Sequence, residues 1–158
     1  MRHTIIASVE NKFGVLARIA GMFSGRGFNI DNLNVGPTMN PSMSRMTIVV
    51  RGDDKVLEQV TRQLEKLVDV IDVKDIRDEE HVDRELVLLR LRAGSETRAE
   101  IIQICEIFRA KIVDVQPAKL IVELTGAEDK IAQFLELMEP FGIEDLIRTG
   151  KVALARGK

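Results

Sequence analysis

Residues that carry catalytic or metal chemistry are scarce in this chain of 158 residues, which has no Trp, no Tyr, one Cys and two His. A single cysteine excludes a disulfide within the chain. Cys105 falls on the apolar stripe of a predicted helix, which is typical of a buried thiol without a catalytic role. His3 and His81 lie far apart, and neither has ligand partners at the spacing of a metal motif. With no nucleophile–base pair either, we expect no catalytic residue, no metal site and no cofactor in this chain.

The chain also has no large excess of charge of one sign and no long apolar run. The formal net charge is −2 with no basic block, so the electrostatic footprint of a nucleic-acid-binding protein is absent. No apolar run approaches the roughly 20 residues of a membrane span, and Met1-Arg2-His3 leads directly into a predicted strand. We therefore expect a cytoplasmic protein with neither a nucleic acid nor a membrane as its partner.

Hydrophobic periodicity predicts the same order of elements twice, strand-helix-strand-strand-helix-strand. In the first half the elements are Thr4–Glu10, Val15–Ser24, Phe28–Val35, Arg45–Arg51, a helix that Asp53 and Asp54 begin, and Val70–Ile76. In the second half they are Glu85–Leu91, a helix after Thr97, Lys111–Val115, Leu120–Leu124, a helix after Thr125, and Ile143–Ile147, with a short extra strand at Val152–Leu154. Thr97 with Glu100 and Thr125 with Glu128 are predicted capping boxes.

The predicted fold class is therefore α+β, with two ferredoxin-like βαββαβ domains. We expect a first domain over residues 1–77, a charged linker over 78–82 and a second domain over 83–158. Domains of about 75 residues have marginal hydrophobic cores, so association of sheets or dimerisation is expected to complete the burial.

The turn between the first predicted strand and helix is the candidate binding site. Gly14 at the mouth of the helix lets the backbone approach a ligand, and the amides from Gly14 to Leu16 point outward with the positive end of the helix dipole. Asn11 adds a side chain that can donate and accept hydrogen bonds. This arrangement suits the carboxylate and ammonium of an amino acid, although a simple tight turn would have the same sequence.

Only the first half of the chain has such a turn. The corresponding segment of the second half is Ala93-Gly94-Ser95-Glu96, where an acid stands at the position of an anionic ligand. Asn29, at the start of the second strand, is a further candidate because its side chain could hold an ammonium. Turn formation next to Gly27 is the alternative interpretation of Asn29.

These residues resemble a known family. Asn11–Ile19 and Phe23–Ile30 resemble an ACT domain, a small-molecule sensor of amino-acid metabolism. The resemblance extends over both halves to the regulatory (small) subunits of acetolactate synthase, also called acetohydroxyacid synthase. The further matching segments are Val35–Thr38, Ser44–Ile48, Lys66–Val70, His81–Leu86, Glu106–Arg109, Ile112–Val115 and Arg148–Gly157.

The resemblance implies a non-catalytic subunit of branched-chain amino acid biosynthesis. Such a subunit forms a homodimer whose ACT domains pair side by side, and it binds and activates a catalytic (large) subunit that carries thiamine diphosphate, Mg²⁺ and FAD. It also confers feedback inhibition by valine. The side chains here do not rank valine against leucine or isoleucine, since one methylene discriminates by only ~1–3 kcal/mol.

The resemblance also implies which residues hold the effector. Asn11, Gly14, Val15 and Leu16 of one chain would bind its carboxylate, and Asn29 and Ile30 would meet it from the other chain. Lys12 and Phe13 occupy variable positions and receive no role.

Two other functions fit the same plan less well. An RNA-binding module would need aromatic side chains on its central strands, and Thr4–Glu10 and Arg45–Arg51 have none. A free-standing sensor that acts on another enzyme or on transcription would not require the second domain, and no helix-turn-helix pattern accompanies it.

Overall fold

The computed structural model describes residues 1–77 and 79–157, and the chain divides into two compact units. Unit 1 comprises Met1–Val82 together with the C-terminal segment from Lys151 onward, and unit 2 comprises Asp83–Gly150. The sequence-based boundaries differ because they assigned this C-terminal segment to the second domain. Position 78 of the predicted linker and position 158 of the predicted second domain lie outside the described residues.

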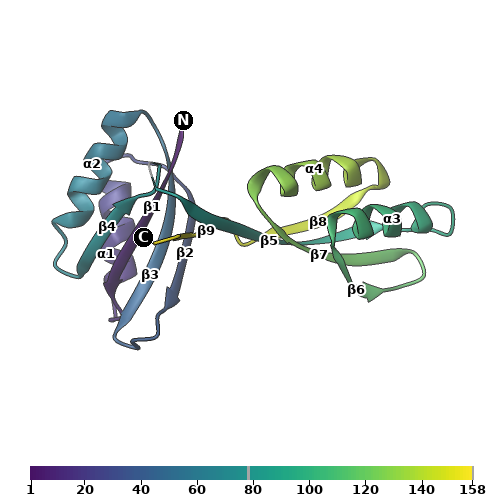
Figure 1. The fold of residues 1–158 in the computed structure, drawn as a ribbon, viewed down its shortest axis with the longest axis horizontal. Helices are drawn as coiled ribbons and strands as arrows, with labels where there is room; N and C mark the ends of the chain where they lie inside the picture. The colour runs from purple at the N-terminus through teal and green to yellow at the C-terminus, as the bar shows by residue number, and fades with distance from the viewer. Residues whose placement is uncertain (78, 158) are drawn as a thin grey trace. The chain divides into compact units, whose positions relative to one another are not determined.

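Unit 1 is a four-stranded antiparallel sheet with both of its helices on one face (Figure 1). The strand order is β2-β3-β1-β4, so β2 and β4 are the edges. In chain order the elements are β1 (Arg2–Glu10), α1 (Val15–Gly25), β2 (Ile30–Pro37), β3 (Met43–Arg51), α2 (Asp54–Glu65) and β4 (Val70–Asp75). This is the predicted βαββαβ order.

Alternation along the two central strands builds the core of unit 1. Every second residue of β1 and β3 points toward the helices, as the period of two in a strand requires. The buried cluster comprises Ile5, Ala7, Val9, Val15, Ile19, Phe23, Met46, Ile48, Val50, Leu57, Val60 and Leu64.

Unit 2 repeats the plan with the strand order β6-β7-β5-β8. Its elements are β5 (His81–Arg92), α3 (Arg98–Phe108), β6 (Lys111–Val115), β7 (Lys119–Gly126), α4 (Glu128–Met138), a 3₁₀ turn (Glu139–Phe141) and β8 (Ile143–Arg148). A last strand, β9 (Val152–Ala155), pairs with β5, whose first residues His81 and Val82 belong to unit 1. His81 and Val82 of the predicted linker are therefore part of a strand.

Helix capping agrees with the sequence at α2 and differs at α3 and α4. Asp53 caps α2, and its Oδ1 accepts a hydrogen bond from the Val56 amide at 2.9 Å. Thr97 precedes α3 but makes no side-chain cap, since its own backbone is already helical. Thr125 lies inside β7, and Ala127 begins α4. Both predicted capping boxes are therefore wrong.

No helix within the described residues is long and apolar enough to cross a membrane.

Candidate functional site

The turn between β1 and α1 lies at the residues that the sequence predicted, and the backbone conformation of Gly14 is an additional finding. Gly14 stands immediately before α1 with φ of 82°, in the left-handed region that disfavours residues with a β-carbon. The entry into the turn is fixed by the Asn11 amide, which donates to the Ser42 carbonyl at 2.8 Å. The chain thus leaves β1 and enters α1 through a defined turn.

The N-terminus of α1 has no side-chain cap and no acid in its first turn. The Val15 amide makes only a long hydrogen bond of 3.4 Å to the Lys12 carbonyl. Among residues 1–77 and 79–157, the amides of Gly14 and Leu16 donate to no acceptor. Unpaired amides at the positive end of a helix dipole favour an anion, so this turn can accept a carboxylate.

The side chain of Asn11 keeps its oxygen available at the same turn. Its Nδ2 donates to the Pro41 carbonyl at 3.0 Å, which leaves Oδ1 as an acceptor. An acceptor beside unpaired amides is the pattern that a zwitterionic amino acid requires.

The cations nearest the turn are engaged by acids. Arg18 contacts the Asp69 carboxylate through Nε at 2.7 Å and through Nη2 at 2.6 Å. Lys12 pairs with Glu10 at 2.9 Å, and this carboxylate raises the pKa of the exposed Lys12 ammonium above its ordinary value. Neutralised side chains leave the backbone amides as the main anion-attracting groups of the turn.

Asn29 and Ile30 lie at the start of β2, beside an acid that the sequence analysis did not single out. Asn29 Nδ2 donates to Asp31 Oδ1 at 2.7 Å, so the Asn29 oxygen also remains an acceptor. The Asp31 carboxylate in turn contacts Arg2 at 3.3 Å and Arg51 at 3.0 Å. The charge pattern of the sequence could not predict the contacts of Asp31 with Arg2 and Arg51, because the three residues come from three different strands.

Within a single chain, the candidate residues of the Gly14 turn lie far from Asn29 and Ile30. Ile30 pairs with Val50, which pairs with His3 near the start of β1. The turn that contains Gly14 follows the other end of β1, after Glu10. Seven residues of strand separate the two ends, or roughly 23 Å at ~3.3 Å per residue.

His3 and Cys105 are buried side chains. His3 is buried, and its Nε2 lies 3.0 Å from the Gly52 carbonyl oxygen. Burial of Cys105 raises the pKa of its thiol to about 11, which keeps it protonated at neutral pH. Within the described part of the chain, no three His, Cys, Asp or Glu side chains could together hold a metal ion.

Comparison with known proteins covers nearly all of the chain. Residues 5–72 match the model described as the AHAS small subunit-like ACT domain, and residues 84–157 match that of the small subunit of acetolactate synthase. A probable acetolactate synthase small subunit of Archaeoglobus fulgidus is 56% identical over 99% of this chain and 98% of its own length. The acetolactate synthase small subunit of Aquifex aeolicus is 50% identical over 98% of this chain and 81% of its own.

A solved structure agrees with these sequence matches. The crystal structure of the acetolactate synthase small subunit from Thermotoga maritima superposes with a TM-score of 0.90 at 40% identity, covering 100% of this chain and 99% of that one. The ACT assignment of the first half and the resemblance of the whole chain are confirmed. The chain belongs to the acetolactate synthase small subunit family, and its first unit is the ACT domain of that family.

Proposed function

We propose that this chain binds and activates the catalytic subunit of acetolactate synthase, and that it confers feedback inhibition by valine bound between two ACT domains. The observation that carries the effector site is the uncapped N-terminus of α1 behind Gly14. The role of the chain is regulatory and non-catalytic. Thiamine diphosphate, Mg²⁺ and FAD belong to the catalytic subunit in this proposal.

A dimer formed through the β2 edge would assemble the site. Pro37 at the end of β2 pairs with Ser44, which pairs with Val9 just before the turn. When two β2 strands pair antiparallel about a twofold axis, Ile30 of one chain faces the Pro37 end of the other. Asn29 and Ile30 would then approach the Gly14 turn of the second chain.

Pairing through the opposite edge would not have this result. β4 is separated from β2 by two central strands, so a dimer formed there would leave Asn29 remote from either turn. The β2 edge is therefore the proposed dimer contact.

The proposed effector contacts use both chains. The carboxylate of valine accepts from the first-turn amides at Gly14, Val15 and Leu16, and its ammonium donates to the Asn11 and Asn29 oxygens. Hydrogen bonds to charged groups each contribute about 1.5–3 kcal/mol. The isopropyl group packs on Ile30. Leucine and isoleucine remain alternative effectors, because one methylene changes affinity little.

Feedback follows from the shared contacts. A ligand held by two chains stabilises one arrangement of the dimer over others, and such coupling typically amounts to ~1–3 kcal/mol. Activation of the catalytic subunit is assigned to surfaces outside this site, including unit 2.

Reconstitution tests this function. The purified chain is added to the catalytic subunit from the same genome, loaded with thiamine diphosphate, Mg²⁺ and FAD, and acetolactate formation is measured with and without L-valine. We expect the rate to rise with the added chain and to fall with valine only when the chain is present. An unchanged rate would contradict the proposed activation, and a valine-independent rate would contradict the proposed feedback.

A further inference from the structure

The C-terminal segment packs against the face of the unit 1 sheet that is turned away from α1 and α2, here called the outer face. Ala153 is 8% exposed and forms a small buried cluster with Ile6 and Ile76. Its amide donates to the buried Oγ1 of Thr47 on β3 at 3.3 Å. The strand Val152–Ala155 is therefore part of the ACT unit.

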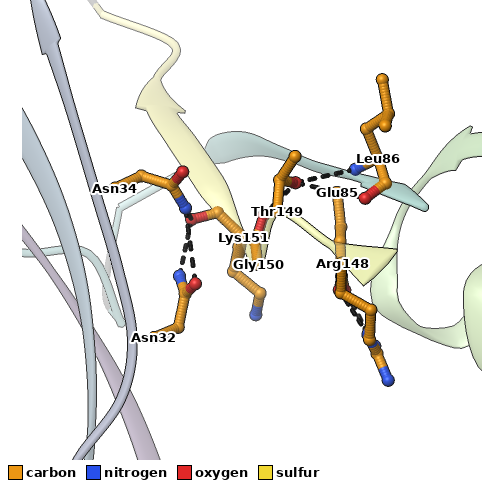
Figure 2. A network of polar contacts seen from close by, with 8 residues as sticks. All are labelled: Asn32, Asn34, Glu85, Leu86, Arg148, Thr149, Gly150 and Lys151. Carbon is orange, nitrogen blue, oxygen red and sulfur yellow. Dashed lines mark hydrogen bonds and ion pairs between the residues drawn. The ribbon is translucent and has the colours of Figure 1, made fainter. Parts of the chain in front are cut away.

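Two asparagines of β2 hold this segment at its beginning. Figure 2 shows the side-chain amides of Asn32 and Asn34 converging on the backbone carbonyl of Lys151. The distances from Nδ2 to the carbonyl oxygen are 2.8 Å for Asn32 and 3.1 Å for Asn34. Both side chains lie on the outer face because alternate residues of a strand share a face.

The proposed effector residues lie at the beginning of the same strand: Asn29 precedes β2, and Ile30 is its first residue. Asn29 and Ile30 precede Asn32 by only three and two positions, and the pairing register of β2 with β3 shifts between Ile30 and Asn32. The intervening Asp31 accepts from Asn29 and pairs with Arg51. A shift of register is a local irregularity at which a strand can bend.

On the unit 2 side, the residues that precede Lys151 are fastened to β5. Arg148 contacts Glu85 through Nε at 2.6 Å and Nη2 at 3.0 Å, and the Thr149 amide donates to the Leu86 carbonyl at 3.0 Å (Figure 2). Gly150 follows with φ of 76°, a conformation that suits glycine.

The segment borders a cavity on the outer face. A cavity of about 790 Å³ lies in unit 1, and its lining includes Ile6 and Arg45 of the sheet and Leu154 and Ala155 of the segment. The cavity thus adjoins the part of the segment that follows the Lys151 and Ala153 contacts.

We propose that Asn32 and Asn34 are positioning residues that couple effector binding at the start of β2 to the C-terminal segment returning from unit 2. The coupling rests on the proposed effector site. It would link ligand binding at that site to unit 2 along the chain that precedes Lys151. A ligand at Asn29 and Ile30 shifts β2 at its irregularity, and the two amides carry the shift to the Lys151 carbonyl.

Hydrogen exchange on the full-length protein tests this coupling, with L-valine as the probe. Asn32→Asp replaces the closer donor with a carboxylate that repels the Lys151 carbonyl, and Asn32→Ala removes the donor without adding charge. Asn40→Asp is the matched control, because this residue of the same hairpin uses its side-chain oxygen as an acceptor from Ser42 and aspartate keeps that role. Calorimetric titration of each variant measures valine binding independently.

In the unchanged protein and in Asn40→Asp, we expect valine to change the exchange rate of amides 149–155 at least about fivefold, the lower end of typical allosteric couplings. Both Asn32 variants should still bind valine, with an affinity changed by no more than the coupling factor, because such coupling is reciprocal. The response of their amides 149–155 should be smaller than in the unchanged protein, since of the two donors to the Lys151 carbonyl only the Asn34 amide remains. A full response in the Asn32 variants would overturn the inference and leave the effector site intact. Loss of valine binding in them would also overturn it, since Asn32 would then act on the site itself. If the unchanged protein bound neither valine, leucine nor isoleucine, the proposed effector site would fail and the coupling with it.

Discussion

A β-carbon added at Gly14 would lie 3.2 Å from Nη1 of Arg18, one helical turn along α1. The Arg18 guanidinium is held by Asp69, so a side chain at position 14 would lie between this ion pair and the first turn of α1. In the proposed site, a side chain added at Gly14 would stand next to the amides that bind the carboxylate of the effector.

Gly14→Asp should abolish the valine response while activation of the catalytic subunit survives. The new carboxylate stands against that of the effector, and the affinity should fall at least about tenfold more than in Gly14→Asn, a difference of ~1.4 kcal/mol. Asparagine matches aspartate in shape and in its tolerance of positive φ, so backbone strain is equal in the two variants. Valine inhibition of the reconstituted enzyme is the measurement. Equal inhibition of the two variants by valine would show that the Gly14 turn does not bind the carboxylate of the effector.

Val35→Asp should weaken the dimer. Val35 on the β2 edge is 46% exposed, and a twofold contact along β2 would bring two new carboxylates into one interface. Ile71→Asp is the control, since Ile71 is 54% exposed on the β4 edge. In sedimentation velocity runs we expect monomers to accumulate only in the Val35 variant. If Ile71→Asp dissociated the dimer instead, the dimer contact would be at β4.

Ala153→Asp should destabilise unit 1, because it buries a carboxylate beside Ile6 and Ile76. The neighbouring Leu154 is 59% exposed, so Leu154→Asp should change stability little. We expect a loss of about 1–3 kcal/mol for the Ala153 variant and within about 0.5 kcal/mol for the Leu154 variant in urea titrations. Similar midpoints for the two variants would mean that the C-terminal segment does not stay on the outer face in solution.

Cys105 should make stability depend on alkaline pH. Its pKa is raised to about 11 in the folded chain, whereas an unfolded thiol ionises near pH 8.5. The stabilising contribution is therefore fully present below the unfolded pKa and is lost as the pH rises from about 8.5 toward 11. Relative to Cys105→Ala, the protein should lose about 1–2 kcal/mol between pH 8 and pH 10. A pH-independent difference between the two proteins would show that the thiol is not protected by burial.

The alternating pattern was sufficient to predict the βαββαβ order, because each strand has one face toward helices and shows period two. The turn at Gly14 was predictable from a different signal, because a glycine there separates the alternating strand from the apolar helical stripe that begins at Val15. The capping boxes predicted at Thr97 and Thr125 were wrong, because threonine also occurs in helical turns and in strands. Local sequence does not show which of these conformations the backbone adopts. The two-amide contact with Lys151 was not predictable, because it joins β2 to a segment more than a hundred residues later.

Calorimetric titration of the purified full-length protein with L-valine tests the effector site shared by two chains more directly than any other measurement. We expect saturable binding at the dimer interface, with an affinity that falls when the protein is diluted below its dimer dissociation constant. Binding that is unaffected by Gly14→Asp, or that persists in a monomeric Val35→Asp variant, would contradict a site shared between the Gly14 turn of one chain and Asn29 of the other.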